Sequence, residues 1–147
     1  MDAPGLSIDH LSNGFAGTIL TPGDEGFDDA RRVWNAMIDR KPVVIARCRG
    51  TADVMRAVRF AADNGLGVAI RGGGHNVAGH AVCDGSVMLD LSEMRTVHVD
   101  PVRRTAIVEG GATWAEVDRE TQVFGLATPG GLISETGVAG LTLSGGF

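Results

Sequence analysis

Apolar side chains recur with a helical period from residue 27 onward, while the charged side chains of the same segment fall on other faces. This period predicts an amphipathic helix over residues 27–38. Its inner face would consist of Phe27, Ala30, Val33, Trp34, Met37 and Ile38. We therefore expect Trp34 and Met37 to lie in the core. The residues before about Gly23 carry turn signals and predict a loop with one short strand.

A strand, a helix and a second strand follow. Residues 43–46 form a continuous apolar run, typical of a strand buried on both faces. Thr51 is a candidate N-cap for a helix that ends at Asn64 and Gly65, and residues 67–70 return as a strand. The apolar stripe predicted for this helix leaves out Asp53 and Phe60 and consists of Val54, Met55, Val58, Ala61 and Ala62. Such a unit is expected to be parallel and right-handed, with functional loops at the carboxyl ends of its strands.

The rest of the chain predicts three more strands and one more helix. Residues 86–91, 96–99 and 105–109 alternate as strands do, and the last two are close enough for an antiparallel hairpin. Thr113 and Glu116 form a capping-box sequence for a helix that runs to about Val123 and stops at Gly125. The predicted fold class is α+β: a small parallel strand–helix–strand unit followed by a mixed or antiparallel sheet with flanking helices.

Charge and composition restrict the partners of the protein. The 147 residues suit one domain, and a net charge of −5 without a basic run argues against nucleic acid or an anionic membrane surface as partner. Residues 1–5 lack the features of a secretory signal and no apolar stretch approaches membrane-spanning length, so a cytoplasmic protein is expected. Cys48 and Cys83 are expected to be reduced and buried, with a disulfide between them as the alternative. The oligomeric state is not predicted.

Glycine is the unusual feature of this composition, with 22 residues. Three of them, Gly72–Gly74, directly follow a predicted strand and precede His75. Because they lack Cβ atoms, backbone N–H groups of this loop can converge on one anion, with the imidazole at the rim. Gly79 and a second glycine-dense stretch, residues 137–146, favour a ligand site over a tight turn with an ordinary surface histidine. His75, His80 and Cys83 match no metal-ligand spacing, so no metal site is expected.

Three common motifs are absent. The residues after Gly74 do not continue a G-x-G-x-x-G fingerprint, and His80 stands where a Walker A loop needs lysine. Ser144 lacks the G-x-S-x-G context of a serine hydrolase. Phosphoryl transfer and serine-dependent hydrolysis therefore have no support.

A series of short motifs in a fixed order is more specific. They are Arg71-Gly72-Gly73-Gly74-His75-Asn76, Gly79, Cys83-Asp84-Gly85, Asp90-Leu91-Ser92, Val99-Asp100-Pro101, Gly110-Gly111-Ala112, Gly125-Leu126-Ala127 and Thr136-Gly137-Val138-Ala139-Gly140-Leu141-Thr142-Leu143. Together they resemble the amino-terminal half of the PCMH-type FAD-binding domain of the vanillyl-alcohol-oxidase superfamily. Within it, the sequence is similar to berberine-bridge-enzyme-like FAD-linked oxidases.

The resemblance implies roles for particular residues. The residues that match the pyrophosphate-binding loop are Arg71, Gly72, Gly73, Gly74, His75 and Asn76, with Gly79 beyond it, and those that would line the flavin are Thr136, Gly137, Gly140 and Leu141. His75 matches the histidine that bonds to the flavin 8α carbon. Ile133 stands where doubly linked relatives carry cysteine, so one covalent link, through His75, is implied. No catalytic base is assigned.

The resemblance also implies a domain division and a function. Residues 1–22 would be a lead-in, and residues 23–147 an incomplete FAD-binding domain without its substrate domain, because the chain stops inside a glycine-rich element and relatives are longer. The implied parent is an oxidase that transfers hydride from an alcohol, sugar or related small substrate to FAD, with molecular oxygen as acceptor. Two alternatives remain open: a non-catalytic fragment that binds FAD weakly or packs against a partner chain, and a nucleotide binder without redox chemistry.

Overall fold

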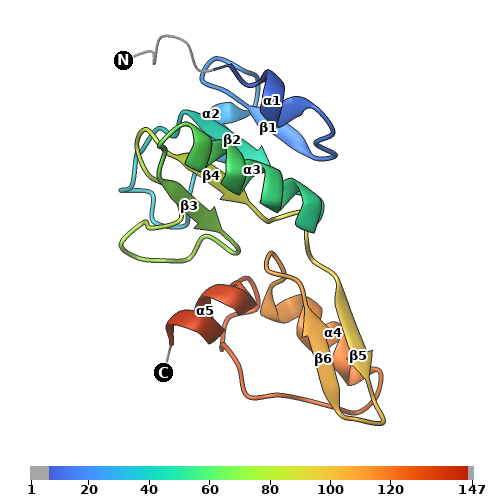
Figure 1. Ribbon diagram of the computed structural model, residues 1–147. Helices are drawn as coiled ribbons and strands as arrows, with labels where there is room; N and C mark the ends of the chain where they lie inside the picture. Colours follow the sequence, from blue (N-terminus) through green and yellow to red (C-terminus); the bar gives the residue numbers. More distant parts are fainter. Residues whose placement is uncertain (1–6, 146–147) are drawn as a thin grey trace.

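The computed structural model describes residues 7–145. Residues 1–6, which include the stretch tested above for a secretory signal, lie outside this range, as do Gly146 and Phe147. The main sheet has the order β1-β2-β4-β3 and contains β1 (Thr18–Leu20), β2 (Val44–Arg47), β3 (Val68–Arg71) and β4 (Val87–Asp90) (Figure 1). β2 and β3 both pair parallel to β4, whereas β1 pairs antiparallel to β2.

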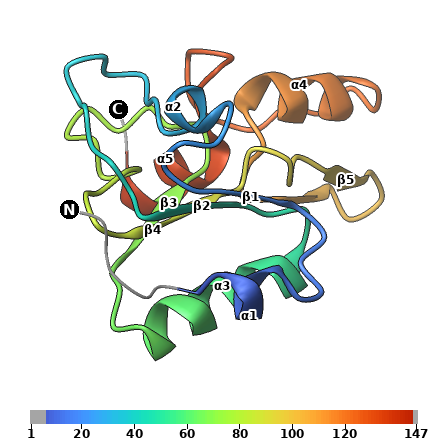
Figure 2. The same ribbon diagram turned by 90° about the horizontal axis from the view of Figure 1, so that it is seen from above.

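Helices cover both faces of this sheet (Figure 2). On one face lie α1 (Asp9–Ser12) and α3 (Thr51–Asp63), where Leu11, Ala57 and Phe60 pack against Val87 and Leu89. On the other face lies α2 (Phe27–Ala30), whose two buried residues pack against Ile45, Val82 and Met88. The two central strands, β2 and β4, are thus buried on both faces, as the continuous apolar run of residues 43–46 predicts, whereas Val68 and Ile70 of the edge strand β3 are exposed.

A second part of the molecule follows the carboxyl edge of the sheet (Figure 1). It consists of the hairpin β5 (Val97–Asp100) and β6 (Thr105–Val108), then α4 (Trp114–Gln122) and α5 (Val138–Ser144). At the start of α4, the Thr113 and Glu116 side chains form the predicted capping box. The hairpin forms a separate antiparallel two-stranded sheet, in agreement with the predicted antiparallel hairpin after the parallel unit, and the main sheet is mixed because of β1.

The predicted α+β class and the parallel strand–helix–strand unit are confirmed. β4 lies between the two strands of that unit, a placement that the chain order does not reveal. α3 ends as predicted, at Asn64 and a left-handed Gly65 with φ of 63°.

The prediction of one helix over residues 27–38 was wrong. α2 ends at Ala30, and residues 31–38 form turns and irregular backbone instead of continuing the helix. Val33 and Ile38 do pack against the core, but Trp34 is 63% and Met37 is 90% exposed. The backbone N–H of Trp34 donates to the Gly74 carbonyl (3.0 Å), a long-range bond that replaces a helical one.

The apolar stripe predicted for α3 was also wrong. Phe60 and Asp53 are buried, whereas Met55 and Val58 are exposed. Asp53 tolerates burial because its carboxylate accepts hydrogen bonds from the backbone N–H groups of Ala16 and Arg49, both at 2.9 Å. The N-cap is Gly50, and Thr51 is the first helical residue.

The two cysteines differ. Both are free thiols, but only Cys48 is buried, so the prediction of burial was wrong for Cys83. Burial, with the nearby charges of Asp53 and Asp90, raises the pKa of Cys48 to about 12.

In residues 7–145, no helix has the length and apolar character needed to cross a bilayer.

A row of three charges connects the carboxyl ends of the parallel strands. Arg47, Asp90 and Arg71 are in register on β2, β4 and β3. The Asp90 side chain is fully buried and accepts from Arg47 Nε (2.9 Å), Arg71 Nη2 (2.6 Å) and the Ser92 N–H (3.0 Å). Burial alone would raise the pKa of Asp90, but the charge and hydrogen bonds of Arg71, together with bonds from Arg47 and Ser92, hold the pKa below its ordinary value.

We predict that Asp90→Asn lowers the free energy of unfolding at pH 7 by about 3 kcal/mol, because it leaves two arginines without their counter-charge. The folded-state pKa of Asp90 is lowered, so its stabilisation is present above the ordinary carboxyl pKa and is lost as pH falls through the folded-state value. Urea unfolding at pH 7 and pH 3 should therefore show a smaller difference between variant and wild type at pH 3. Asp118→Asn, at an exposed position of α4, is the control; an equal effect of both variants would contradict the prediction.

Candidate functional site

The glycine loop after β3 and the start of α5 enclose one cavity of about 620 Å³. This volume is in the range of small-molecule sites. All of the predicted cofactor residues except Arg71 and Gly79 line it: Gly72, Gly73, Gly74, His75, Asn76, Thr136, Gly137, Gly140 and Leu141. Residues more than 60 positions apart in sequence thus line the same cavity.

The two glycine segments touch through their backbones. A Cβ on Gly73 would lie 2.4 Å from the Gly137 nitrogen, and one on Gly137 would lie 2.4 Å from the Gly73 nitrogen. A Cβ on Gly72 would lie 2.7 Å from the Gly110 carbonyl oxygen. These three positions therefore require glycine for chain-to-chain contact, independently of any ligand.

Short backbone pairing holds the second segment in place. Thr113 and Gly137 form an isolated antiparallel bridge. On either side of it, the Trp114 N–H donates to the Thr136 carbonyl (3.1 Å) and the Val138 N–H donates to the Ala112 carbonyl (3.0 Å). The capped start of α4 thereby fixes the residues that face the glycine loop.

His75 lies at the rim of the cavity and is half-buried. Its Nδ1 is 3.0 Å from the Gly73 carbonyl oxygen, which can only accept, so Nδ1 carries the proton in this contact. The other ring nitrogen, Nε2, then keeps its lone pair in the neutral imidazole. The ring also stacks on Trp34, with centroids 5.8 Å apart and an angle of 23° between the planes.

Arg71 binds neighbouring elements of the fold that support the site. Its guanidinium binds Asp90 and also donates from Nη1 to the Ala30 (2.8 Å) and Arg32 (3.1 Å) carbonyls. It lines a second, smaller cavity of about 230 Å³ on the glycine loop, together with Arg32, Val33, Trp34, Gly72, Gly73, Gly74, Ser92, Arg95, Gly111, Thr113 and Glu135. Gly72–Gly74 thus line both cavities.

Gly79 lies away from both cavities. Its φ is 74°, and a Cβ there would lie 2.7 Å from Ile38, so a left-handed turn and close packing explain the glycine. Asn76 lines the larger cavity, and its Oδ1 accepts the His80 N–H (3.1 Å), which closes the turn between them.

Gly140 differs from the glycines that touch other backbone. It lies in α5 and lines the larger cavity, yet a Cβ built on it would meet nothing within 4 Å. Glycine in a helix costs up to about 1 kcal/mol relative to alanine, and here no protein contact compensates for it. A side chain at this position would therefore enter open space.

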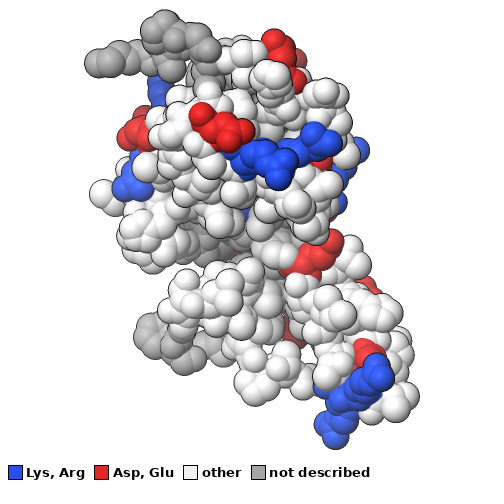
Figure 3. Space-filling model, viewed as in Figure 1, with Lys and Arg blue, Asp and Glu red and all other residues white. Residues whose placement is uncertain are grey.

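The surface of α5 that Figure 3 shows carries no charge. The helix sequence contains no ionisable residue, and the face shown in Figure 3 has no Lys, Arg, Asp or Glu side chain over it. A ligand part that meets α5 would therefore be recognised by shape and by backbone groups.

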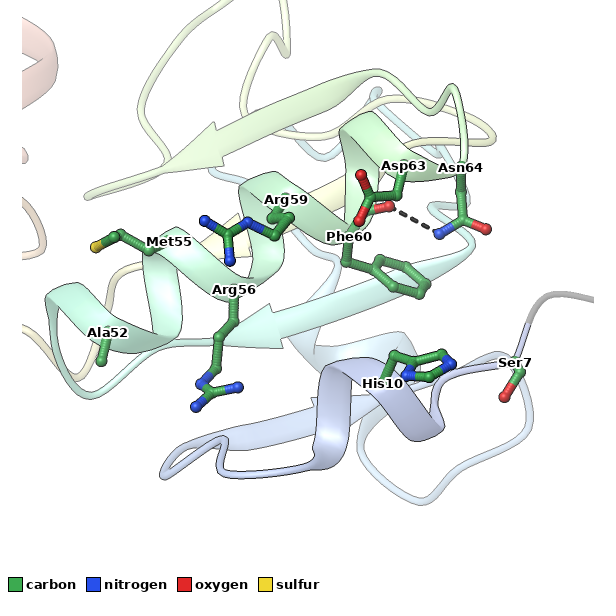
Figure 4. A pocket seen from close by; sticks show the side chains of 9 residues that line it. All are labelled: Ser7, His10, Ala52, Met55, Arg56, Arg59, Phe60, Asp63 and Asn64. Carbon is green, nitrogen blue, oxygen red and sulfur yellow. Dashed lines mark hydrogen bonds between the residues drawn. The ribbon is translucent and has the colours of Figure 1, made fainter.

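A third cavity lies far from these residues, between α1 and α3 (Figure 4). It is about 770 Å³, and the side chains that line it include His10, Arg56, Arg59 and Asp63. It contains no glycine loop and none of the predicted site residues. In the part of the chain that the structure describes, no three His, Cys, Asp or Glu side chains come together as metal ligands would.

The fold, together with the cavity between the glycine loop and α5, defines the class of the protein. It is an α+β domain of the PCMH-type FAD-binding kind. The chain belongs to the FAD binding domain family, whose model matches residues 42–147.

Individual relatives agree with this assignment. Over 130 residues the chain is 39% identical to (R)-6-hydroxynicotine oxidase of Paenarthrobacter nicotinovorans, covering 88% of this chain and 28% of the relative. The structure of 6-hydroxy-D-nicotine oxidase from Arthrobacter nicotinovorans matches with a TM-score of 0.84 and 37% identity, over 95% of this chain and 29% of that one. A variant of Physcomitrella patens BBE-like 1 matches with a TM-score of 0.84 and 25% identity, over 90% and 29%. The chain thus spans less than a third of the length of these relatives.

Sequence reasoning missed some residues of the two cavities. Ile70, Ala81 and Ser144 line the larger one, and Ser92 and Arg95 the smaller one. Ile70 is the next-to-last residue of β3 and Ser92 lies two residues after β4, which was an available signal because ligands bind at the carboxyl edge of parallel strands. Trp34 gave no such signal, since its position depends on a bond to a residue 40 positions away.

We predict that Gly73→Ala lowers the free energy of unfolding by about 1–3 kcal/mol, because its methyl group cannot coexist with the Gly137 backbone. Gly67→Ala is the matched control, since a Cβ there meets nothing within 4 Å. Denaturant unfolding of both variants checks this. Equal stability of the two would show that the Gly73–Gly137 contact does not form.

Proposed function

We propose that this chain is the FAD-holding part of an oxidoreductase, residues 23–147 forming the cofactor-binding domain. The backbone of Gly72–Gly74 would hold the diphosphate, with Arg71, Asn76 and Gly79 shaping the loop. Thr136, Gly137, Gly140 and Leu141 would line the flavin. The observation that carries this proposal is the cavity on which two distant glycine segments converge, beside a helix with an unfilled glycine position.

The residues present fit this cofactor. The glycine loop supplies backbone N–H groups without side-chain obstruction, as an anion site requires. The uncharged surface of α5 and the open space at Gly140 suit a flat aromatic ring system. His75 offers an imidazole at the rim, and we propose that it forms a single covalent link to the flavin 8α carbon. One C–H bond of the 8-methyl group and one imidazole N–H bond would break, the flavin would take up the electron pair, and molecular oxygen would reoxidise the flavin.

Bound FAD would supply a two-electron acceptor, which fits an oxidase that accepts hydride from an alcohol, sugar or related small substrate and uses molecular oxygen. This chain's residues would bind the cofactor and orient it. Substrate-selecting residues and a catalytic base are expected in the part of the relatives that this chain does not span.

The link is tested by acid precipitation of the full-length protein. Flavin fluorescence should stay in the pellet of the wild type and move to the supernatant for His75→Ala. His80→Ala is the control, because it removes a second imidazole that lines the same cavity. Retention of flavin by His75→Ala would contradict the covalent role. Protein that stays colourless after FAD addition and self-associates would favour the packing fragment, and protection against heat by a nucleotide lacking flavin would favour the simple nucleotide binder.

The fit at α5 is tested separately by Gly140→Ala. Without FAD, we expect this variant to be more stable by up to about 1 kcal/mol, because alanine favours the helix. With FAD, we expect about tenfold or greater loss of affinity, since the methyl group occupies ligand space. Gly67→Ala, remote from the cavity, should leave affinity unchanged. Calorimetric titration on the His75→Ala background measures it, and unchanged affinity of Gly140→Ala would show that FAD does not approach α5.

A further inference from the structure

Residues 31–40, which we call the bracing segment, run along the outside of the glycine loop. Three side-chain or backbone groups bind loop carbonyls: the Trp34 N–H donates to Gly74 (3.0 Å), Asn35 Nδ2 to Val77 (2.8 Å) and Arg40 Nη1 to Gly79 (3.1 Å). Arg40 Nη1 also donates to the Val82 carbonyl (3.2 Å). The segment thus binds the loop at successive points from one end to the other.

Its own conformation is fixed from both sides. Arg31 forms ion pairs with Asp28 (2.6 Å) and with Asp39, which brings the two ends of the segment together. Val33 and Ile38 pack against the core beside α2. The bracing segment therefore contacts both the core of the main sheet and the glycine loop, and these contacts fix the backbone that carries its exposed residues.

Trp34 is the exposed residue whose position this arrangement determines. Its side chain is not needed by the core, because Trp34 is 63% exposed, yet its indole stacks on the His75 ring. His75 is thus held on two sides: its face by the indole, and its edge by the contact of Nδ1 with the Gly73 carbonyl. An imidazole on a glycine-rich loop would otherwise rotate among several rotamers.

We infer that Trp34 is a positioning residue for His75: the bracing segment uses its indole to fix the plane of the imidazole at the rim of the cavity. This inference rests on the proposed function, in which His75 carries the flavin. Trp34 would act on His75 rather than on the cofactor. Its removal should slow formation of the covalent link while leaving non-covalent FAD binding unaffected.

The first experiment needs no cofactor. In FAD-free protein labelled with 15N-histidine, and with His75→Gln used for assignment, the ring nitrogen shifts of His75 should show one neutral tautomer, protonated at Nδ1. Trp34→Ala should give shifts averaged between the two tautomers, and Trp34→Phe, which can still stack, should restore the single tautomer. Met37→Ala is the control, because Met37 is 90% exposed in the same segment. A single unchanged tautomer in Trp34→Ala would overturn the inference.

The second experiment adds FAD to the cofactor-free full-length protein and follows acid-stable flavin over time. We expect Trp34→Ala to slow incorporation by about tenfold or more, since small misplacements of a reacting group are costly. Trp34→Phe should keep most of the wild-type rate, and Met37→Ala all of it. On the His75→Ala background, Trp34→Ala should leave FAD affinity unchanged; a loss there would mean that Trp34 contacts the cofactor and would overturn the inference.

Failure of the two proposals can be told apart. If wild-type protein binds FAD but never forms an acid-stable link, the covalent role of His75 is wrong. The tautomer comparison then still decides whether Trp34 holds the imidazole.

Discussion

The structure depends on a contact between two stretches of bare backbone. Gly73 and Gly137 lie so close that neither position has room for a Cβ, and a Cβ on Gly72 would collide with the Gly110 carbonyl oxygen. This contact joins the carboxyl edge of the main sheet to the part of the molecule that carries α4 and α5. The larger cavity is a consequence, because its two walls are the segments that this contact brings together.

Two other interactions make the contact possible. The charge row of Arg47, Asp90 and Arg71 fixes where the parallel strands end, and the glycine loop starts from the last of these residues. On the opposite side, the capped start of α4 pairs with residues 134–138 and sets the position of Gly137. Each wall of the cavity is therefore anchored in regular structure.

Local signals in the sequence were enough to predict much of this fold. The capping box of Thr113 and Glu116 needs only neighbouring residues, and so does the end of α3 at Gly65. The glycine loop was recognisable because it follows a strand. Most of the predicted site residues line one cavity, although their roles toward FAD stay predictions.

The errors came from interactions between residues far apart in the chain. The helical period of residues 27–38 is real, but the bond from Trp34 to Gly74 and the pairing of Arg31 with Asp39 stabilise a turn instead. Asp53 lies on the buried face of α3 because its carboxylate accepts a hydrogen bond from the backbone N–H of Ala16, which is 37 residues away in sequence. Hydrophobic periodicity contains no information about such partners.

The charge row has an implication for how this domain can diversify. Because the strand ends are held by side chains within the sheet, the loops that leave them are mounted on a support that does not depend on loop sequence. Insertions or exchanges farther along these loops, past the glycines that contact Gly110 and Gly137, would then alter ligand preference without unravelling the scaffold. New specificities could accumulate at this edge while the sheet beneath it stays the same.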